Sequence, residues 1–235
     1  MVSFFMKQES TDQFRYELKY LYPQADPQRL ERRVLTHPAM FRTLYPRRWV
    51  NSMYWDTPRF DAYESSINGV SPRMKVRMRW YGDLFGQTEP VLEFKVKQIN
   101  RNRKFTFALG PMEIREGDSP AALARALRDN SRLEPVVREE FSARRPVLLV
   151  RYQRGYYGSH DGKYRVTLDT DLGFSVLWDN GRIAPVRGAR FRDMILELKF
   201  QNDPERAGRI IQEFDLPLQM TRMSKYTSGL EMGRG

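Results

Sequence analysis

The stretch RMKVRMRWY at residues 73–81 alternates basic and apolar side chains, and Tyr81 ends the basic row. A period of two is typical of a β-strand with one polar and one apolar face. The same alternation returns in three other segments, each with a Glu-x-Lys step: Glu17/Lys19, Glu93/Lys95 and Glu197/Lys199. These segments predict strands of one sheet whose charged rows share a face.

Strand-like segments recur along the chain, separated by Gly, Asp and Asn turns, and predict a mostly antiparallel sheet. Helix signals are fewer: Pro27 and Pro120 each follow an N-cap residue and open a helix. Helices do not alternate with the strands, which excludes a doubly wound fold; the fold class is α+β with peripheral helices, and residues 1–235 are expected to form one domain. The expected strands are roughly 13–22, 49–56, 72–81, 90–98, 101–109, 146–157, 163–170, 173–178 and 193–201, and further helices are expected around 136–141, 204–214 and 222–231.

The composition restricts the chemistry. Lys and Arg number 40 against 29 Asp and Glu, a net charge of +11, which predicts an anionic partner such as nucleic acid, an anionic membrane surface or phosphates. There is no cysteine, so disulfides, thiolate metal sites and cysteine nucleophiles are excluded. No apolar run approaches the ~20 residues of a membrane span, and residues 1–11 lack the apolar core of a signal peptide. We expect a cytoplasmic protein without a transmembrane segment.

The charged rows contain almost only Arg, Lys and Glu, whereas an ordinary solvent face also contains Ser, Thr and Gln. Like charges abreast on neighbouring strands destabilise a sheet by up to about 1 kcal/mol per pair. A multiply charged polyanion would offset this repulsion, and the few carboxylates could hold a divalent cation. The charged faces form either an open basic saddle or the lining of a polar barrel.

The chain resembles the VTC (vacuolar transporter chaperone) domain of the triphosphate tunnel metalloenzymes, a superfamily that also contains the CYTH-type triphosphatases. The matching motifs follow the family's order along nearly the whole chain: RYELKY at 15–20, SMYWDT at 52–57, KVRMRWY at 75–81, EFK at 93–95, RVTLD at 165–169, ELK at 197–199 and SKY at 224–226. The resemblance implies an eight-stranded antiparallel β-barrel, a tunnel whose basic lining binds a triphosphate. In the VTC branch the implied reaction is metal-dependent synthesis of inorganic polyphosphate from the γ-phosphate of ATP.

The resemblance also implies site residues and a cofactor. Lys19, Arg77, Arg79, Arg165 and Lys199 would be catalytic, and Arg15, Lys75, Lys95, Lys97, Arg151 and Lys225 would bind substrate phosphates. Glu197, and second Glu93, would bind Mn²⁺ or Mg²⁺; the alternative for both is a salt bridge with neighbouring cations. CYTH relatives open with Glu-x-Glu-x-Lys, but Arg15 replaces the first glutamate here, which argues against CYTH-like hydrolysis.

Other candidate residues have plainer interpretations. His37 and His160 are expected at the surface, and Asp56 is expected to be structural rather than catalytic. Gly162-Lys163 is followed by Tyr164, which excludes a Walker A phosphate-binding loop.

Four functions are therefore compared. The first is a polyphosphate polymerase that uses ATP or another triphosphate; the second is a hydrolase of triphosphate or nucleoside triphosphates on the same scaffold. The third is a polyphosphate-binding sensor without catalysis. The fourth is nucleic-acid binding by a basic sheet face near Trp80, Tyr81 and Phe105; we expect no nucleic-acid partner, because the Glu-x-Lys steps would set carboxylates against backbone phosphates. Recruitment to a membrane by a partner stays open.

Overall fold

The computed structural model describes residues 16–23, 26–98, 101–177, 181–186 and 190–234. Its eight long strands form one antiparallel sheet in the order β1-β11-β9-β8-β2-β3-β5-β6. Two short strands extend it, β12 beside β1 and β10 beside β9. The bounds are β1 Tyr16–Tyr22, β2 Arg42–Asp56, β3 Arg73–Tyr81, β5 Val91–Gln98, β6 Arg101–Ala108, β8 Arg145–Gly158, β9 Tyr164–Val176, β10 Arg190–Phe191, β11 Met194–Phe200 and β12 Gln219–Met220.

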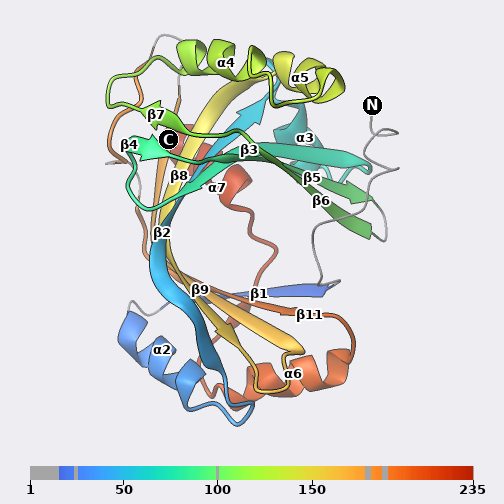
Figure 1. Ribbon diagram of the computed structural model, residues 1–235. Helices are drawn as coiled ribbons and strands as arrows, with labels where there is room; N and C mark the ends of the chain where they lie inside the picture. Colours follow the sequence, from blue (N-terminus) through green and yellow to red (C-terminus); the bar gives the residue numbers. More distant parts are fainter. Residues whose placement is uncertain (1–15, 24–25, 99–100, 178–180, 187–189, 235) are drawn as a thin grey trace.

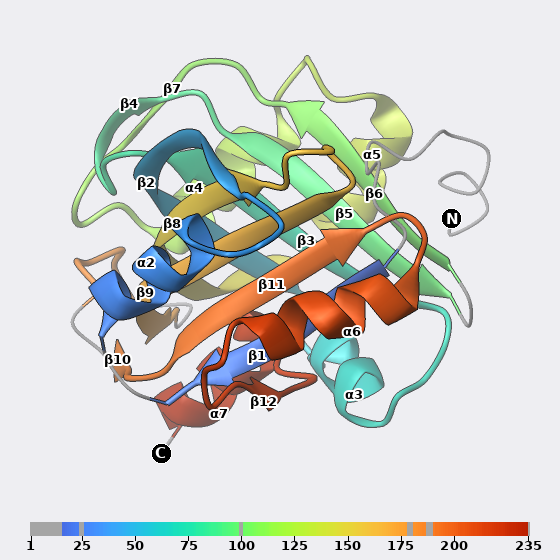
Figure 2. The same cartoon turned by 90° about the horizontal axis from the view of Figure 1, so that it is seen from below.

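The sheet bends into a deep arch with helices on both of its sides (Figure 1). On the convex side, α4 (Pro120–Arg128) and α5 (Pro135–Ser142) cover one half, and α2 (Pro27–Leu35) and α6 (Pro204–Glu213) cover the other. Seen from below, α6 lies across β1 and β11 (Figure 2). The antiparallel α+β fold with peripheral helices is confirmed.

Apolar residues of the strands bury their side chains mainly on the convex side. Val76, Met78 and Trp80 of β3 pack in one core with residues of α4 and α5. Leu196 and Leu198 of β11 pack in a second core with residues of α2 and α6. These cores leave the charged row of each strand on the concave side, as the alternation predicts.

A third core lies on the concave side, where α7 (Lys225–Arg234) packs against β8 and β9. Two glycines of α7 permit this close approach: a Cβ at Gly229 would lie 2.6 Å from the Phe174 ring, and one at Gly233 would lie 2.3 Å from Val176. Tyr226 stacks on Tyr54 at 5.2 Å between ring centroids. The helix therefore occupies part of the arch and brings Lys225 to the charged rows.

The expected eight-stranded closed barrel is not confirmed. Eight long strands are present, but within the described residues no backbone pairing joins β1 to β6. The free side of β1 pairs instead with β12, at Tyr20 and Leu21. The sheet is open at the level of backbone hydrogen bonds.

Several elements differ from the expectation because local patterns do not report long-range pairing. The expected strands 163–170 and 173–178 form the single strand β9, which continues through Asp171 despite its left-handed φ of 54°. β2 begins at Arg42 rather than near residue 49, because its exposed first half still pairs with β8 through bulges. A small separate sheet joins β4 (Gly86–Thr88) to β7 (Met112–Ile114).

Asp56 has the structural role expected of it. Its carboxylate accepts hydrogen bonds from the backbone amides of Thr57, Ala62 and Tyr63 at 2.8–3.0 Å, which holds the start of α3 (Asp61–Ile67), a helix that the sequence pattern did not predict. It also accepts a hydrogen bond from the Tyr226 hydroxyl. One buried carboxylate thus ties α3 and α7 to the end of β2.

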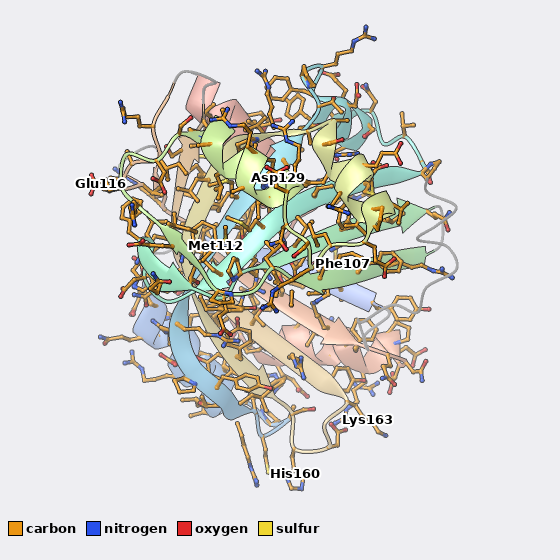
Figure 3. All side chains as sticks on the ribbon, turned by 45° about the horizontal axis from the view of Figure 1, so that its top comes forward. Phe107, Met112, Glu116, Asp129, His160 and Lys163 are labelled. Carbon is orange, nitrogen blue, oxygen red and sulfur yellow. The ribbon has the colours of Figure 1, made fainter. Side chains whose placement is uncertain are left out.

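The expectation that both histidines lie at the surface was wrong for His37. Its side chain is buried, its Nε2 donates to the Ile210 carbonyl at 2.9 Å, and its Nδ1 accepts from the Ala39 amide at 3.0 Å. Burial lowers the pKa of this imidazole, so the neutral ring joins the 37–39 turn to α6. His160 does lie at the surface, in the turn after β8, and its side chain points away from the body of the molecule (Figure 3).

Candidate functional site

The register of the strands decides which charges meet on the concave face. Lys19 pairs with Glu197 and Glu17 with Lys199 across β1 and β11, so these two Glu-x-Lys steps face each other with opposite signs. Arg77 likewise pairs with Glu93 across β3 and β5. The like-charge repulsion expected for the whole face is therefore restricted to fewer positions, since antiparallel pairing matches most carboxylates with cations.

The most enclosed group on this face is a network of two carboxylates and two cations, here called the buried carboxylate network: Asp169, Glu197, Arg154 and Lys225. Arg154 donates to Asp169 through Nη2 at 2.6 Å and to Glu197 at 3.2 Å. Lys225 of α7 lies 2.5 Å from Asp169 and 3.5 Å from Glu197. All four side chains are at most 11% exposed.

Glu197 stays ionised in this network. Burial acts to raise its pKa, but Lys225, Arg154 and Lys19 outweigh burial and hold that pKa well below the usual range. The pKa of Lys225 is raised in turn: burial opposes its charge, and Asp169 and Glu197 more than compensate. The network is thus a set of fixed charges that satisfy one another.

A second carboxylate, Glu93 of β5, is surrounded by cations from the two neighbouring strands, β3 and β6. Arg77 Nε lies 2.5 Å from it, and Arg79 and Lys104 each lie 3.7 Å from it. Arg79 also donates to the Tyr152 hydroxyl at 3.2 Å. Burial would raise the pKa of Glu93, but Arg77 and Arg79 lower it strongly, so this carboxylate is ionised and a weak base.

Glu17 joins strands that are remote from each other in the sheet. It contacts Lys19 at 2.9 Å on its own strand and Lys199 at 3.6 Å on β11. It also lies 3.9 Å from Lys95 of β5, near the opposite edge of the sheet. Burial and Glu197 act to raise the pKa of Glu17, but Lys19, Lys95 and Lys199 lower it to about 2. Side chains therefore bridge the arch where the backbone does not.

Like charges do meet in one place, here called the lysine row: Lys75, Lys95 and Lys104, which lie directly opposite one another on β3, β5 and β6. Lys75 donates to the Ser224 hydroxyl at 2.8 Å and makes no ion pair with a described residue. Burial, reinforced by repulsion from Lys19 and Lys95, lowers the pKa of Lys75 to about 7. Lys95 and Lys104 also lie near Glu17 and Glu93, so the position in this row without a carboxylate partner among the described residues is Lys75.

The structure brings most of the predicted site residues together. Lys19, Arg77, Arg79, Lys199, Lys75, Lys95, Lys225, Glu93 and Glu197 belong to the contacts above. Arg165 lies opposite Lys199 in the β9–β11 register, on the same face, and Lys97 is exposed near the end of β5, opposite Arg73. Arg15 lies outside the described residues.

Arg151 does not lie with the others. Its guanidinium stacks on Trp49 at 4.4 Å, on the opposite face of the sheet. Arg154 lies three residues further along β8 and so points to the other, concave face; the register shift beside Arg151 and Gln153 places an extra residue in β9, not in β8. Arg154, Asp169 and Lys104 are charged residues of the site that were not among the predicted site residues.

The carboxylates do not form a metal cage by themselves. Among the described residues no three His, Cys, Asp or Glu side chains gather closely enough to hold an ion. Each of Glu17, Glu93, Asp169 and Glu197 is already neutralised by two or three cations. Mg²⁺ commonly binds one or two carboxylates together with substrate phosphates; the residues present fit that kind of shared site and not a resident one.

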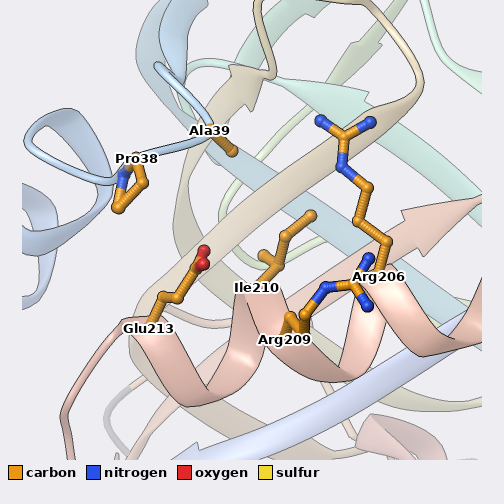
Figure 4. Close-up of a pocket in the computed structure, with 6 residues that line it drawn as sticks. All are labelled: Pro38, Ala39, Arg206, Arg209, Ile210 and Glu213. Atoms are coloured by element: carbon orange, nitrogen blue, oxygen red, sulfur yellow. The ribbon is translucent and has the colours of Figure 1, made fainter.

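A small pocket lies elsewhere, between α6 and residues 38–39 (Figure 4). Arg206, Arg209, Ile210 and Glu213 of α6 line it together with Pro38 and Ala39. Arg206 is paired with Asp161 at 2.7 Å. None of the predicted site residues lines this pocket, so it is separate from the concave face.

Comparison with protein families gives a match to the VTC domain over residues 14–233. The chain belongs to the VTC domain family. A comparison with curated protein sequences found no match. The VTC domain described here has no helix, within the described residues, that is long and apolar enough to cross a membrane.

Two solved structures share the fold of this VTC domain. One is a protein from Hippeastrum, described as an adenylyl cyclase candidate with a dominant triphosphatase activity: TM-score 0.52, 16% identity, covering 92% of this chain and 95% of that one. The other is an adenylate cyclase candidate from Vibrio parahaemolyticus: TM-score 0.51, 13% identity, covering 93% and 99% of the two chains. At this identity the likeness concerns the fold alone, a mostly antiparallel sheet with peripheral helices.

Proposed function

We propose that this VTC domain is an ATP-dependent polyphosphate polymerase, which transfers the γ-phosphoryl group of ATP to a growing polyphosphate chain on the concave face. The observation that carries the proposal is the imbalance of charge on that face. Nine cations from six strands and α7 surround four carboxylates. A triphosphate or polyphosphate supplies the several negative charges that this arrangement lacks.

Phosphoryl transfer depends on positioning and on stabilising charge, with little covalent work for the protein. Arg77 and Arg79 offer planar forks for phosphate oxygens, and Lys19 and Lys199 act as point charges. Arg165 extends this set on β9. Together these five residues would stabilise the transferring group, while Lys75, Lys95, Lys97, Lys225 and Arg154 would hold the flanking phosphates.

Synthesis is favoured over hydrolysis by the acidity of the carboxylates. Hydrolysis needs a water molecule to lose a proton, whereas the terminal phosphate of a polyphosphate acceptor is already an anion. Glu17, Glu93 and Glu197 all have lowered pKa values and are ion-paired, so they are poor bases for activating water. An anionic acceptor needs no such base.

A divalent cation, Mn²⁺ or Mg²⁺, would arrive with the triphosphate and share Glu197, with Glu93 as a second candidate. Bound there, it would neutralise charge on the phosphate oxygens. The protein's own part is to keep Glu197 ionised through Lys19, Arg154 and Lys225. Lys225 and Arg154 already pair with the Glu197 carboxylate. Glu197 would therefore bind the metal ion only together with the substrate phosphates.

The test is incubation of the purified protein with ATP and either metal, with products separated by gel electrophoresis. Long-chain polyphosphate supports the proposal; orthophosphate alone would establish the hydrolase instead. The Glu197→Gln variant should lose turnover while Glu116→Gln, the same change at an exposed position, keeps it. If Glu197→Gln retains triphosphate binding and wild type shows no turnover with either metal, the domain is a polyphosphate sensor.

A further inference from the structure

A group of aromatic residues surrounds one arginine beside the phosphate-facing residues. The guanidinium of Arg48 lies 4.0 Å from the ring centroid of Tyr81, 5.0 Å from that of Tyr156 and 5.6 Å from that of Tyr45. Tyr45 and Tyr156 meet edge to face, with 5.6 Å between their centroids. These four residues, the arginine–tyrosine cluster, come from the adjacent strands β2, β3 and β8.

The cluster continues the charged rows along the same strands. Tyr81 follows Arg79 by two residues, Tyr156 follows Arg154 by two, and Arg48 is the register partner of Arg154. At about 3.3 Å per strand residue, Tyr81 lies roughly 13 Å along β3 from Arg77. A ligand whose phosphates contact Arg77 and Arg79 could therefore extend its other end to these rings.

The exposure of the rings separates this cluster from ordinary packing. Tyr45 is 49% exposed and Tyr81 is 42% exposed, whereas Tyr152 and Tyr226 on the same face are almost completely buried. Arg48 makes no ion pair with a described residue, so its charge is balanced by aromatic faces. Exposed tyrosines beside a stacked guanidinium are a platform for another flat ring.

We propose that the arginine–tyrosine cluster binds the base of the nucleoside triphosphate, and this rests on the proposed function for the phosphate end. The contacts available are ring faces and a guanidinium plane rather than a set of groups matched to one base edge. Stacking of this kind tolerates different bases. ATP and GTP should therefore bind alike, and both should bind more tightly than inorganic tripolyphosphate does through the shared phosphates alone.

The experiment compares ATP, GTP and tripolyphosphate by titration calorimetry on wild type and two variants of Tyr81. Loss of a stacking ring weakens binding roughly fivefold to 150-fold. Tyr81→Leu should weaken ATP and GTP within that range and leave tripolyphosphate within about twofold, while Tyr81→Phe should behave as wild type. Tyr45→Leu, at a second exposed ring, repeats the test without touching β3.

The outcomes separate this inference from the function on which it rests. If Tyr81→Leu and Tyr45→Leu weaken all three ligands equally, or none of them, the cluster is no base site although phosphate binding persists. If wild type binds ATP but not GTP, a base edge is being recognised and the stacking proposal is wrong. If wild type binds neither tripolyphosphate nor ATP, the phosphate site itself is refuted, and the base site with it.

Discussion

The buried carboxylate network and the lysine row lie on the same face but treat charge in opposite ways. In the network, Asp169 and Glu197 are matched by Arg154 and Lys225, and no side chain is more than 11% exposed. In the lysine row, Lys95 is 47% and Lys104 is 32% exposed, and Lys75 has no carboxylate partner among the described residues. The difference predicts that changes in the network affect stability most, and that the row contributes cations to the anion binding of the proposed function.

The largest effect should come from Asp169→Asn, which removes one carboxylate of the network. Arg154 and Lys225 would then be buried with one partner fewer, and breaking a buried pair of this kind costs about 3–5 kcal/mol. Chemical denaturation followed by circular dichroism measures the loss. Lys95→Met in the row is the matched control and should change the free energy of unfolding by no more than about 1 kcal/mol; equal losses would contradict the division of roles.

The opposite result is expected for Lys75→Met, which should weaken the binding of tripolyphosphate without lowering the free energy of unfolding. A hydrogen bond to a charged group contributes about 1.5–3 kcal/mol, so tripolyphosphate should bind roughly 10- to 150-fold more weakly. The free energy of unfolding should stay equal or rise, because repulsion from Lys19 and Lys95 is relieved. Lys163→Met, in the surface turn of Figure 3, removes the same net charge and should leave binding unchanged at moderate salt.

A smaller effect is the uptake of protons on ligand binding. It follows from the pKa of Lys75, which is about 7 in the free protein. A bound polyanion favours the charged ammonium and raises that pKa, so above pH 7 binding takes up a proton and the affinity falls as pH increases. Calorimetry at pH 8 in two buffers of different ionisation enthalpy measures the uptake. Lys75→Met should reduce it, and the part that persists should come from Lys95, whose pKa burial also lowers. Identical uptake in wild type and variant would exclude Lys75 as the source.

The smallest effect is expected from Arg151→Gln. Because Arg151 stacks on Trp49 on the other face of the sheet, tripolyphosphate affinity should stay within about twofold of wild type. An affinity loss as large as that of Lys75→Met would mean that the face assigned to Arg151 is wrong.

Sequence periodicity predicted most of the strands and which side of each carries charge, because antiparallel strands with one buried face must alternate. It placed Arg77, Lys95 and Glu197 on that face correctly. It could not tell which of Arg151 and Arg154 faces the site, since residues 151–156 of β8 carry polar side chains on both faces and the alternation alone does not choose between them. It also missed α3, which has no apolar stripe and is held by Asp56 instead.

The charge balance was only partly predictable for a related reason. Whether Lys19 lies opposite Glu197 or opposite another lysine depends on strand order and register. The two strands that decide this, β1 and β11, lie near opposite ends of the sequence and pair only in the folded chain. The burial of His37 likewise depends on α6, which comes more than 160 residues later. Such long-range contacts are absent from a local pattern.

The contact between Glu17 and Lys95 spans the arch without any backbone ladder beside it in the described residues. Among these residues, side chains alone therefore join the two halves of the sheet here. In the proposed function, a phosphate would replace Glu17 as the partner of the Lys95 ammonium and release this carboxylate. In the proposed reaction, a growing polyphosphate chain would pass between the two edges of the sheet without breaking a backbone hydrogen bond of the sheet.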